Sequence, residues 1–166
     1  MITYRSALPA DIPSMEILIL AEGQNEWNYL PEEDIHKHLA GIETDSVWAV
    51  LAEDEKQMLG FASYELVKTY AKYEPEEFKD REHGYIAEAV VCRNSTGKGI
   101  GSELFRKARD ELVNMGYPRI YAIRHEENKP SARMMEKAGF EVIAEFDDPE
   151  RRPTGSGKTA VCRYVH

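Results

Sequence analysis

Apolar positions divide the first half of the chain into strand-like segments separated by polar turns. Residues 2–5 alternate like a short strand, and residues 47–52 form an apolar run typical of a buried strand. A polar loop at 53–57 separates that run from a second one at 58–67, its expected antiparallel partner. The pattern predicts an antiparallel meander.

Four segments have the signals of helices. We expect the first near 13–22 and the second at 31–39, where Pro31 and three acidic residues occupy the start. In 100–115 the apolar residues recur on one helical face, and Gly116 follows as a stop. A short fourth helix is expected at 131–138, ending at Gly139.

The long helix lies between two predicted strands. Residues 85–92 are almost continuously apolar and precede it, and a short strand at 120–123 follows it. A strand, a crossover helix and a strand imply parallel pairing with a right-handed crossover. With final strands at 140–144 and 160–165, we expect an α/β (α+β) protein whose mixed sheet is largely antiparallel around one central parallel pair.

Segment 68–83 is charged, with Tyr70 and Tyr73 scattered through it and Pro75 as a breaker. It predicts a surface loop or an irregular helical turn. No linker or repeat divides the chain, so we expect one domain spanning residues 1–166.

Composition narrows the class of protein. The chain has 166 residues, 42% hydrophobic and 31% charged, and no run apolar enough for a membrane span. Its beginning lacks the pattern of an export signal, so we expect a cytoplasmic protein. The formal net charge of −9 argues against a nucleic-acid partner and favours cationic small molecules.

Cys92 and Cys162 are far apart in the sequence and have no metal-ligand spacing. They are better interpreted as reduced, mostly buried thiols than as a disulfide scaffold. No metal site is predicted.

A glycine-rich turn joins the strand at 85–92 to the long helix. Gly97, Gly99 and Gly101 let the backbone approach phosphate oxygens closely, and the helix N-terminus adds partial positive charge. Lys98 offers a mobile cation. The turn therefore suits a pyrophosphate, although these glycines also fit a tight turn with no ligand.

A second glycine-rich segment, residues 155–159, imitates the end of a nucleotide-binding P-loop. That motif requires glycine where Arg152 stands, and it must lead into a helix, whereas residues 161–165 read as a strand. We interpret this segment as a hairpin loop.

The glycine-rich turn before the long helix resembles motif A of the GNAT acetyltransferase superfamily, Q/R-x-x-G-x-G/A. Gly99 and Gly101 meet this pattern. Thr96 departs from the family's Gln or Arg. Residues 128–140, from Asn128 to a closing Gly-Phe, are similar to the family's motif B. The resemblance covers the whole chain and implies a GNAT-like mixed sheet flanked by about four helices.

The resemblance implies acetyl-CoA as the cofactor, with coenzyme A as product. The exposed backbone of the strand before the glycines would hold its pantetheine arm, and the glycine loop would hold its pyrophosphate. The implied cofactor-binding residues are Val90, Val91, Cys92, Thr96, Gly97, Lys98, Gly99, Ile100, Gly101, Ser102, Asn128 and Ser131.

In the family the amine attacks directly within a ternary complex. Glu88, on the strand that leads into the glycines, is the candidate base, because burial would raise its pKa; a salt-bridged or hydrogen-bonded strand residue is an equal alternative. His83 and His125 fit the positions of solvated loop or strand-end histidines better than catalytic ones. Met135 occupies the position of the family's tyrosine acid and cannot donate a proton, which leaves Tyr121 and Tyr164 as weak substitutes.

For the acceptor, the resemblance points to the segments that hold Trp27, Tyr29, Tyr70 and Tyr73, together with Glu88. Aromatic rings and nearby Glu26 and Glu32 suit a small cationic amine, although solvated loop aromatics fit equally well. Two alternatives stay open: a protein or peptide N-acetyltransferase, and a non-catalytic acyl-CoA sensor. The resemblance also leaves a homodimer open.

Overall fold

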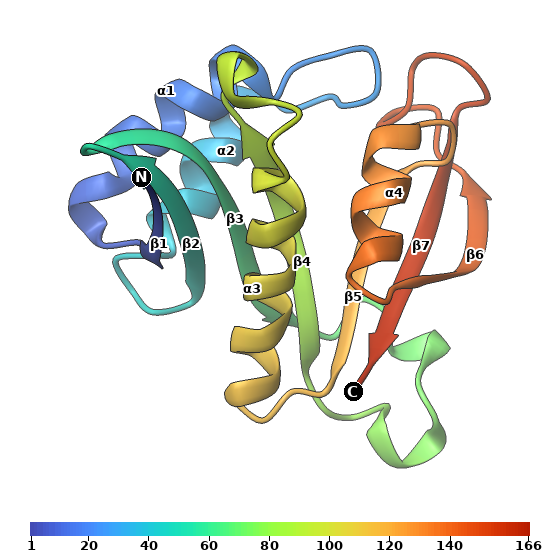
Figure 1. Cartoon of the computed structure of the whole chain (residues 1–166). Coiled ribbons are helices and arrows are strands. Elements are labelled where there is room, and N and C mark those ends of the chain that lie inside the picture. Colours follow the sequence, from blue (N-terminus) through green and yellow to red (C-terminus); the bar gives the residue numbers. More distant parts are fainter.

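The computed structural model describes residues 1–166 and contains one mixed sheet of seven strands in the order β1-β2-β3-β4-β5-β7-β6 (Figure 1). Only β4 and β5 pair in parallel; every other neighbouring pair is antiparallel. This confirms the predicted mixed sheet. The strands are β1 (Ile2–Ser6), β2 (Val47–Asp54), β3 (Gln57–Val67), β4 (His83–Val91), β5 (Arg119–His125), β6 (Glu141–Asp147) and β7 (Lys158–Val165).

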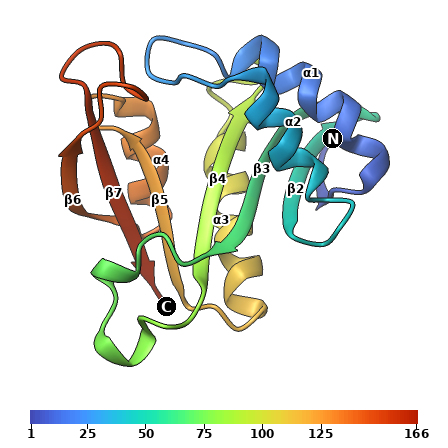
Figure 2. The same cartoon turned by 180° about the vertical axis from the view of Figure 1, so that it is seen from behind.

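Four α-helices flank the sheet, as predicted: α1 (Ile12–Glu22), α2 (Glu32–Ala40), α3 (Ile100–Asn114) and α4 (Lys129–Lys137). Helices α3 and α4 cover one face of the sheet, and α1 and α2 cover the other face over β2 to β4 (Figures 1 and 2). None of these helices has the length and apolar character needed to cross a bilayer.

Alternation along the strands gives each helical layer its own hydrophobic core. On β2, Val50 and Ala52 pack with α3 and α4, whereas Ala49 and Leu51 pack with α1 and α2. Successive side chains of a strand point to opposite faces. A strand that reads as continuously apolar is therefore one that is buried on both faces.

The hairpin between β2 and β3 is tighter than the sequence predicts. The loop expected at 53–57 contains only Glu55 and Lys56, because Asp54 already pairs with Gln57. Both loop residues have positive φ, 48° and 70°, the backbone that two-residue hairpin turns require. Glu53, Asp54 and Gln57 were expected in the loop because their side chains are polar, although they belong to the strands.

Segment 68–83 is less exposed than the sequence predicts. It contains two 3-10 turns, Ala71–Tyr73 and Glu76–Phe78, and His83 already belongs to β4. Tyr70 and Glu74 are buried, and the ring of Tyr70 stacks on that of Tyr121 at 5.1 Å. The segment packs against the sheet because its few aromatic residues find partners there.

Strands β4 and β5 separate soon after they meet. Their parallel register covers only Gly84 opposite Ile120 and Tyr85 opposite Tyr121. Farther along, β4 remains paired with β3 and β5 with β7. The sheet therefore splits into two halves. Beyond these two positions, the backbone groups on the facing edges of β4 and β5 do not pair with each other.

Candidate functional site

The edge of β4 that faces the split carries unpaired backbone groups. The N–H of Cys92 donates to the carbonyl of Leu59 at 2.7 Å, towards β3. Adjacent N–H groups of a strand point to opposite sides, so those of Val91 and Ala89 point into the gap, where β5 offers no partner. An extended ligand with amide groups can pair with this edge.

The predicted glycine turn lies at the end of β4 and begins α3. Gly97 and Gly99 have φ of 81° and 76°, a left-handed backbone that glycine adopts without strain. A Cβ at either position would meet no atom within 4 Å. The glycines therefore leave open space in front of the backbone, in addition to permitting the turn.

Helix α3 adds donors to this open space. Its first intrahelical bond runs from the N–H of Glu103 to the carbonyl of Gly99, so the N–H groups of Ile100, Gly101 and Ser102 have no acceptor within the helix. A Cβ at Gly101 would lie 3.5 Å from a methyl carbon of Val91 and 3.6 Å from the sulfur of Met134, so the helix start lies close to β4 and α4. The turn and the helix together form a cradle for an anion.

Thr96 and Lys98 frame this cradle loosely. The Thr96 hydroxyl donates to the carbonyl of Arg93 at 3.0 Å and so stabilises the 3-10 turn before the glycines. Lys98 is exposed and makes no ion pair. Thr96 thus supports the local backbone, and Lys98 is free to approach a ligand.

Asn128 and Ser131 lie at the start of α4. The Asn128 side chain accepts a hydrogen bond from the Ser131 N–H at 3.2 Å and caps the helix. Met135 is buried in the core between α3 and α4. Met135 is therefore a packing residue with no proton to donate.

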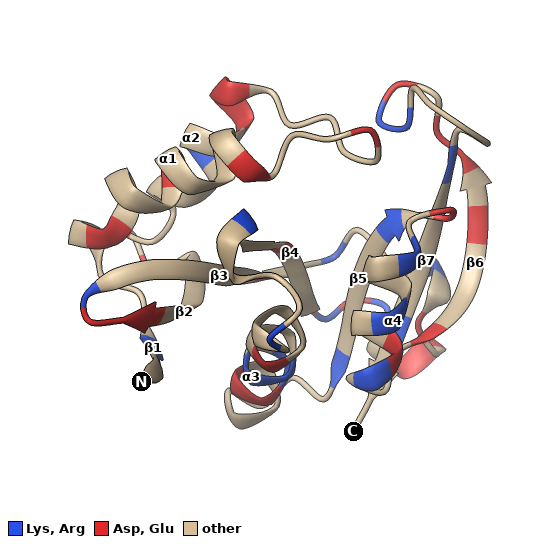
Figure 3. Cartoon of the chain, turned by 45° about the horizontal axis from the view of Figure 1, so that its top comes forward, with Lys and Arg blue, Asp and Glu red and all other residues tan.

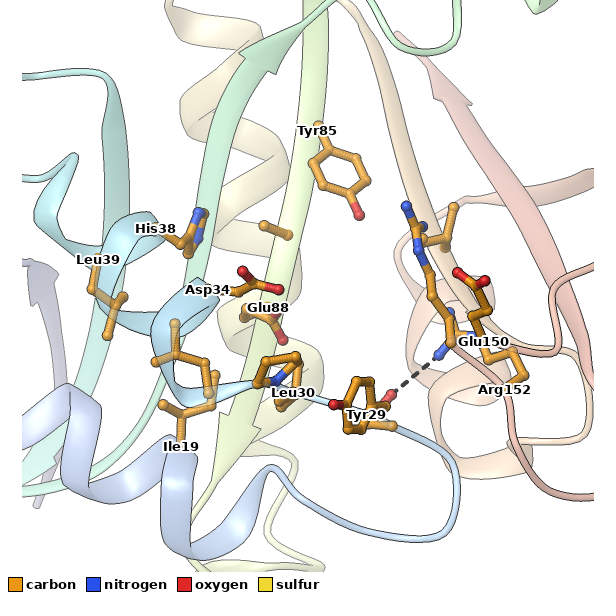
Figure 4. Close-up of a pocket in the computed structure, with 16 residues that line it drawn as sticks. Ile19, Tyr29, Leu30, Asp34, His38, Leu39, Tyr85, Glu88, Glu150 and Arg152 are labelled. Carbon is orange, nitrogen blue, oxygen red and sulfur yellow. Dashed lines mark hydrogen bonds between the residues drawn. The ribbon is translucent and has the colours of Figure 1, made fainter.

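A cavity of about 450 Å³ lies on the other side of the split, beneath α2 (Figure 4). Two loops approach each other in Figure 3, residues 23–31 between α1 and α2 and residues 148–157 between β6 and β7, and residues of both loops line the cavity. Hydrogen bonds from Arg152 to the carbonyl of Trp27 at 3.1 Å, and from Thr154 to that of Glu26, join the loops. The polar residues that line the cavity include Asp34, His38, Tyr85, Glu88, Glu150, Arg151 and Arg152.

A β-bulge aims Glu88 into this cavity. Ser63 lies opposite Glu88 and Tyr64 opposite Ile86, so Ala87 is an extra residue in β4. The bulge places Ala87 and Glu88 on the same side, and both line the cavity. Without the extra residue, one of them would point to the α3 face.

Burial dominates the electrostatics of Glu88. It raises the pKa of the carboxyl group from 4.5 to about 7, while the charges of His38 and Arg152 oppose the rise. Glu88 makes no ion pair and no side-chain hydrogen bond, so neither partner of the structural alternative is present. It is a carboxylate that can accept a proton near neutral pH.

His38 holds the wall beside Glu88. Its Nε2 lies 2.8 Å from the Ser63 hydroxyl, and its Nδ1 lies 3.0 Å from the Glu65 carboxylate. Ser63 is the strand partner of Glu88. Helix α2 is thereby fixed to β3 next to the bulge, with an imidazole at the cavity surface.

Of the predicted acceptor residues, Tyr29 and Glu88 line the cavity but Trp27 does not. The Trp27 ring packs edge-on against His125 with centroids 5.0 Å apart. Tyr70 and Tyr73 are also outside the lining and pack with Tyr121 instead. None of these three rings lines this cavity, and each packs against another aromatic ring instead.

His83 and His125 lie at strand ends, one of the two expected positions, but they are 2% and 0% exposed, so the expectation that they are solvated was wrong. The Nδ1 of His125 accepts from the Glu127 N–H at 3.0 Å, and its Nε2 lies 2.8 Å from the Thr154 carbonyl. His83 accepts from the Tyr70 N–H at 3.2 Å. Neither imidazole lines the cavity.

The substitute acids are also engaged elsewhere. The Tyr121 hydroxyl donates to Glu74 at 2.9 Å inside the core, and the Tyr164 hydroxyl lies 2.9 Å from His166. Tyr85, which sequence reasoning missed, is the tyrosine of β4 that lines the cavity, and burial raises the pKa of its hydroxyl. No side chain is thereby identified as an acid.

The profile of the acetyltransferase (GNAT) family matches residues 12–140 of this chain. Comparison with curated protein sequences finds no significant relative.

Solved structures share the fold. The ribosomal-protein-alanine N-acetyltransferase of Brucella melitensis is 21% identical, with 99% of each chain covered and a TM-score of 0.74. The mosquito arylalkylamine N-acetyltransferase like 5b is 14% identical, with 100% of each chain covered and a TM-score of 0.76. The Arabidopsis thaliana protein NAA60, solved with acetyl-CoA, is 13% identical, with 99% of this chain and 98% of that chain covered and a TM-score of 0.77.

At these sequence identities, similarity to the solved structures establishes the fold alone. The match to the family profile establishes the family. The profile spans most of the chain, including the bulged β4, the glycine turn and α4. The chain therefore belongs to the acetyltransferase (GNAT) family.

Proposed function

We propose that the protein is an N-acetyltransferase that uses acetyl-CoA and acetylates the primary amine of a small molecule. The observation that carries this proposal is the position of Glu88. It is a carboxylate without an ion pair, with a pKa of about 7, aimed by a bulge into a cavity beside the split of the sheet.

The residues around the split fit coenzyme A. The free N–H and carbonyl groups of Val91 and Ala89 match the amide groups of a pantetheine arm, as a neighbouring strand would. The open space at Gly97 and Gly99, with the free N–H groups of α3, fits a pyrophosphate. Val90 and Cys92 adjoin these groups on β4, and the family resemblance assigns Asn128 and Ser131 of α4 to the same proposed cofactor site.

Acetyl-CoA supplies a thioester, whose carbonyl carbon forms the new C–N bond while its C–S bond breaks. Glu88 in its carboxylate form accepts the proton that the ammonium or the attacking amine must lose. The backbone of β4 and the cavity wall orient the two substrates towards each other. Because no side chain is placed as an acid, water protonates the thiolate.

The two loops favour a small acceptor. They are joined above the cavity by the hydrogen bonds of Arg152 and Thr154, and the cavity of about 450 Å³ has the size of a small-molecule site. Tyr29 lies at its border and is 61% exposed, so its ring is available to an incoming amine.

Acetylation of a protein or peptide is the second candidate, because proteins of this fold include a ribosomal-protein-alanine N-acetyltransferase. A non-catalytic acyl-CoA sensor is the third, because Met135 stands where the family resemblance implies a tyrosine acid.

A transfer assay tests the proposal. The protein is incubated with acetyl-CoA and a panel of primary amines, amino acids and short peptides, and thiol release is followed with mass detection of the acetylated product. We expect transfer to a small amine. Transfer to peptides alone would support the second candidate, and tight acetyl-CoA binding with no transfer to any acceptor would support the sensor.

A further inference from the structure

Arg152 is a buried cation with an incomplete set of partners. The residue is 6% exposed, yet it is one of the residues that line the cavity. Its Nε donates to the Thr159 hydroxyl at 2.9 Å, and its Nη1 donates to the Trp27 carbonyl at 3.1 Å and the Asn28 side chain at 3.4 Å. Nη2 makes no hydrogen bond, so two N–H donors remain available.

No carboxylate pairs with this guanidinium. All of its hydrogen-bond acceptors are neutral, and Asp148 acts at one remove by accepting a hydrogen bond from Thr159 at 2.7 Å. An arginine stays charged in proteins, and an unpaired buried charge is costly. A structural role in joining the loops accounts for Nε and Nη1 but leaves Nη2 unexplained.

Across the cavity lies the opposite charge. Glu88 on β4 and Arg152 on the loop before β7 are on opposite sides of the cavity (Figure 4). Neither makes an ion pair, although each lies in the electric field of the other. Asp34 and His38 of α2 share the side of Glu88, and Glu150 and Arg151 flank Arg152.

This polarity matches a molecule that carries both an amine and an anionic group. We propose that the acceptor is a small amino acid, with its amine at Glu88 and its carboxylate on the free Nη2 donors of Arg152. Guanidinium groups bind carboxylates through charge-assisted hydrogen bonds, and the neutral acceptors on Nε and Nη1 hold the fork in place before the ligand arrives. This inference rests on the proposed function and names the substrate class of that site.

The test compares matched acceptors on the wild-type protein. Each amino acid of a standard panel is offered beside its carboxamide and its decarboxylated amine, and kcat/KM is measured with acetyl-CoA. Because a hydrogen bond to a charged group contributes a factor of about 10 to 100, we expect that preference for the best amino acid over its carboxamide. Equal or better use of the carboxamide would overturn the proposal, as would a preference for a carboxamide-blocked peptide or an O-phosphorylated amine.

A variant assigns the preference to Arg152. In Arg152→Gln the ratio between amino acid and carboxamide should fall to near one, while the exposed Arg81→Gln should keep the wild-type ratio. Because Arg152 also joins the two loops, thermal unfolding of both variants is measured. The ratio of kcat/KM values is then compared at a temperature at which each variant is folded. An unchanged ratio in folded Arg152→Gln would overturn the assignment.

Binding separates this inference from the proposed function. Each amino acid and its carboxamide is titrated calorimetrically into the protein saturated with coenzyme A. A preference for the amino acid in Kd supports the carboxylate site even if no acetyl transfer occurs, and that failure would concern the proposed function. Transfer without a carboxylate preference would reject this inference and leave the acetyltransferase intact.

Discussion

Replacing Glu88 with glutamine removes the carboxylate that β4 presents to the cavity and changes little in shape. A general base contributes about 10²- to 10⁴-fold to a rate, so kcat/KM of Glu88→Gln should fall by that factor at pH 8. Only the carboxylate form accepts a proton. With a pKa of about 7, about one tenth of the wild-type protein is active at pH 6 and about nine tenths at pH 8.

The same substitution should stabilise the protein at high pH. The pKa of Glu88 is 4.5 when exposed and about 7 in the fold, so the folded protein holds a proton that the unfolded chain has released. Wild-type stability therefore falls as the pH rises through this window. Since each pH unit corresponds to about 1.4 kcal/mol, the free energy of unfolding of Glu88→Gln relative to wild type should rise by about 3 kcal/mol between pH 4.5 and pH 8.

Thiol release and thermal unfolding are measured from pH 4.5 to pH 9, with the exposed Glu145→Gln as the control for loss of one negative charge. Loss of activity together with gain of stability excludes misfolding as the cause. If Glu88→Gln keeps the wild-type rate and the same rise of kcat/KM near pH 7, Glu88 is not the base.

Substitutions at three other positions test the remaining parts of the site. Gly99→Asp places a carboxylate in the anion cradle and should abolish acetyl-CoA binding in calorimetry, whereas Gly99→Asn, which also tolerates positive φ, should bind more tightly than Gly99→Asp; equal affinities would contradict the cradle. His38→Gln removes a charge that lowers the pKa of Glu88, so the midpoint of the kcat/KM profile should move to higher pH; a move to lower pH would reject that coupling. Met135→Ala empties a buried position and should reduce the free energy of unfolding by about 2–5 kcal/mol while the pH profile stays unchanged, and a changed profile would return a catalytic role to this position.

Local patterns predicted the cofactor side of the site. The order of strand, glycine turn and long helix is contiguous in sequence, and positive φ at Gly97 and Gly99 is the property that glycine supplies. The parallel pairing of β4 with β5 follows from the crossover helix between them. These features depend on neighbours along the chain, so the sequence alone was sufficient.

The acceptor side depends on contacts between distant segments. His38 reaches Ser63 across 25 residues, and Arg152 reaches Trp27 across 125 residues. The spacing of apolar residues along the chain does not predict contacts between distant segments. It does place Asp34 and His38 on one helical face, because they are four residues apart. The β-bulge at Ala87 was also hidden, because an extra residue in a continuously apolar strand leaves no mark in the pattern.

Misjudged burial accounts for the remaining errors. His83 and Glu74 lie in or next to a charged segment that reads as solvated, but both are buried beside Tyr121. Trp27 was assigned to the acceptor site for its ring, which instead packs on His125. In each case the polar group or ring has a partner from another part of the chain.

Calorimetric titration of the purified protein with acetyl-CoA, and separately with ATP and NAD, tests whether the split in the sheet and the glycine turn form an acetyl-CoA site. We expect saturable one-to-one binding of acetyl-CoA that the other two nucleotides do not reproduce. A folded protein that fails to bind acetyl-CoA, or that binds ATP or NAD equally well, would contradict it.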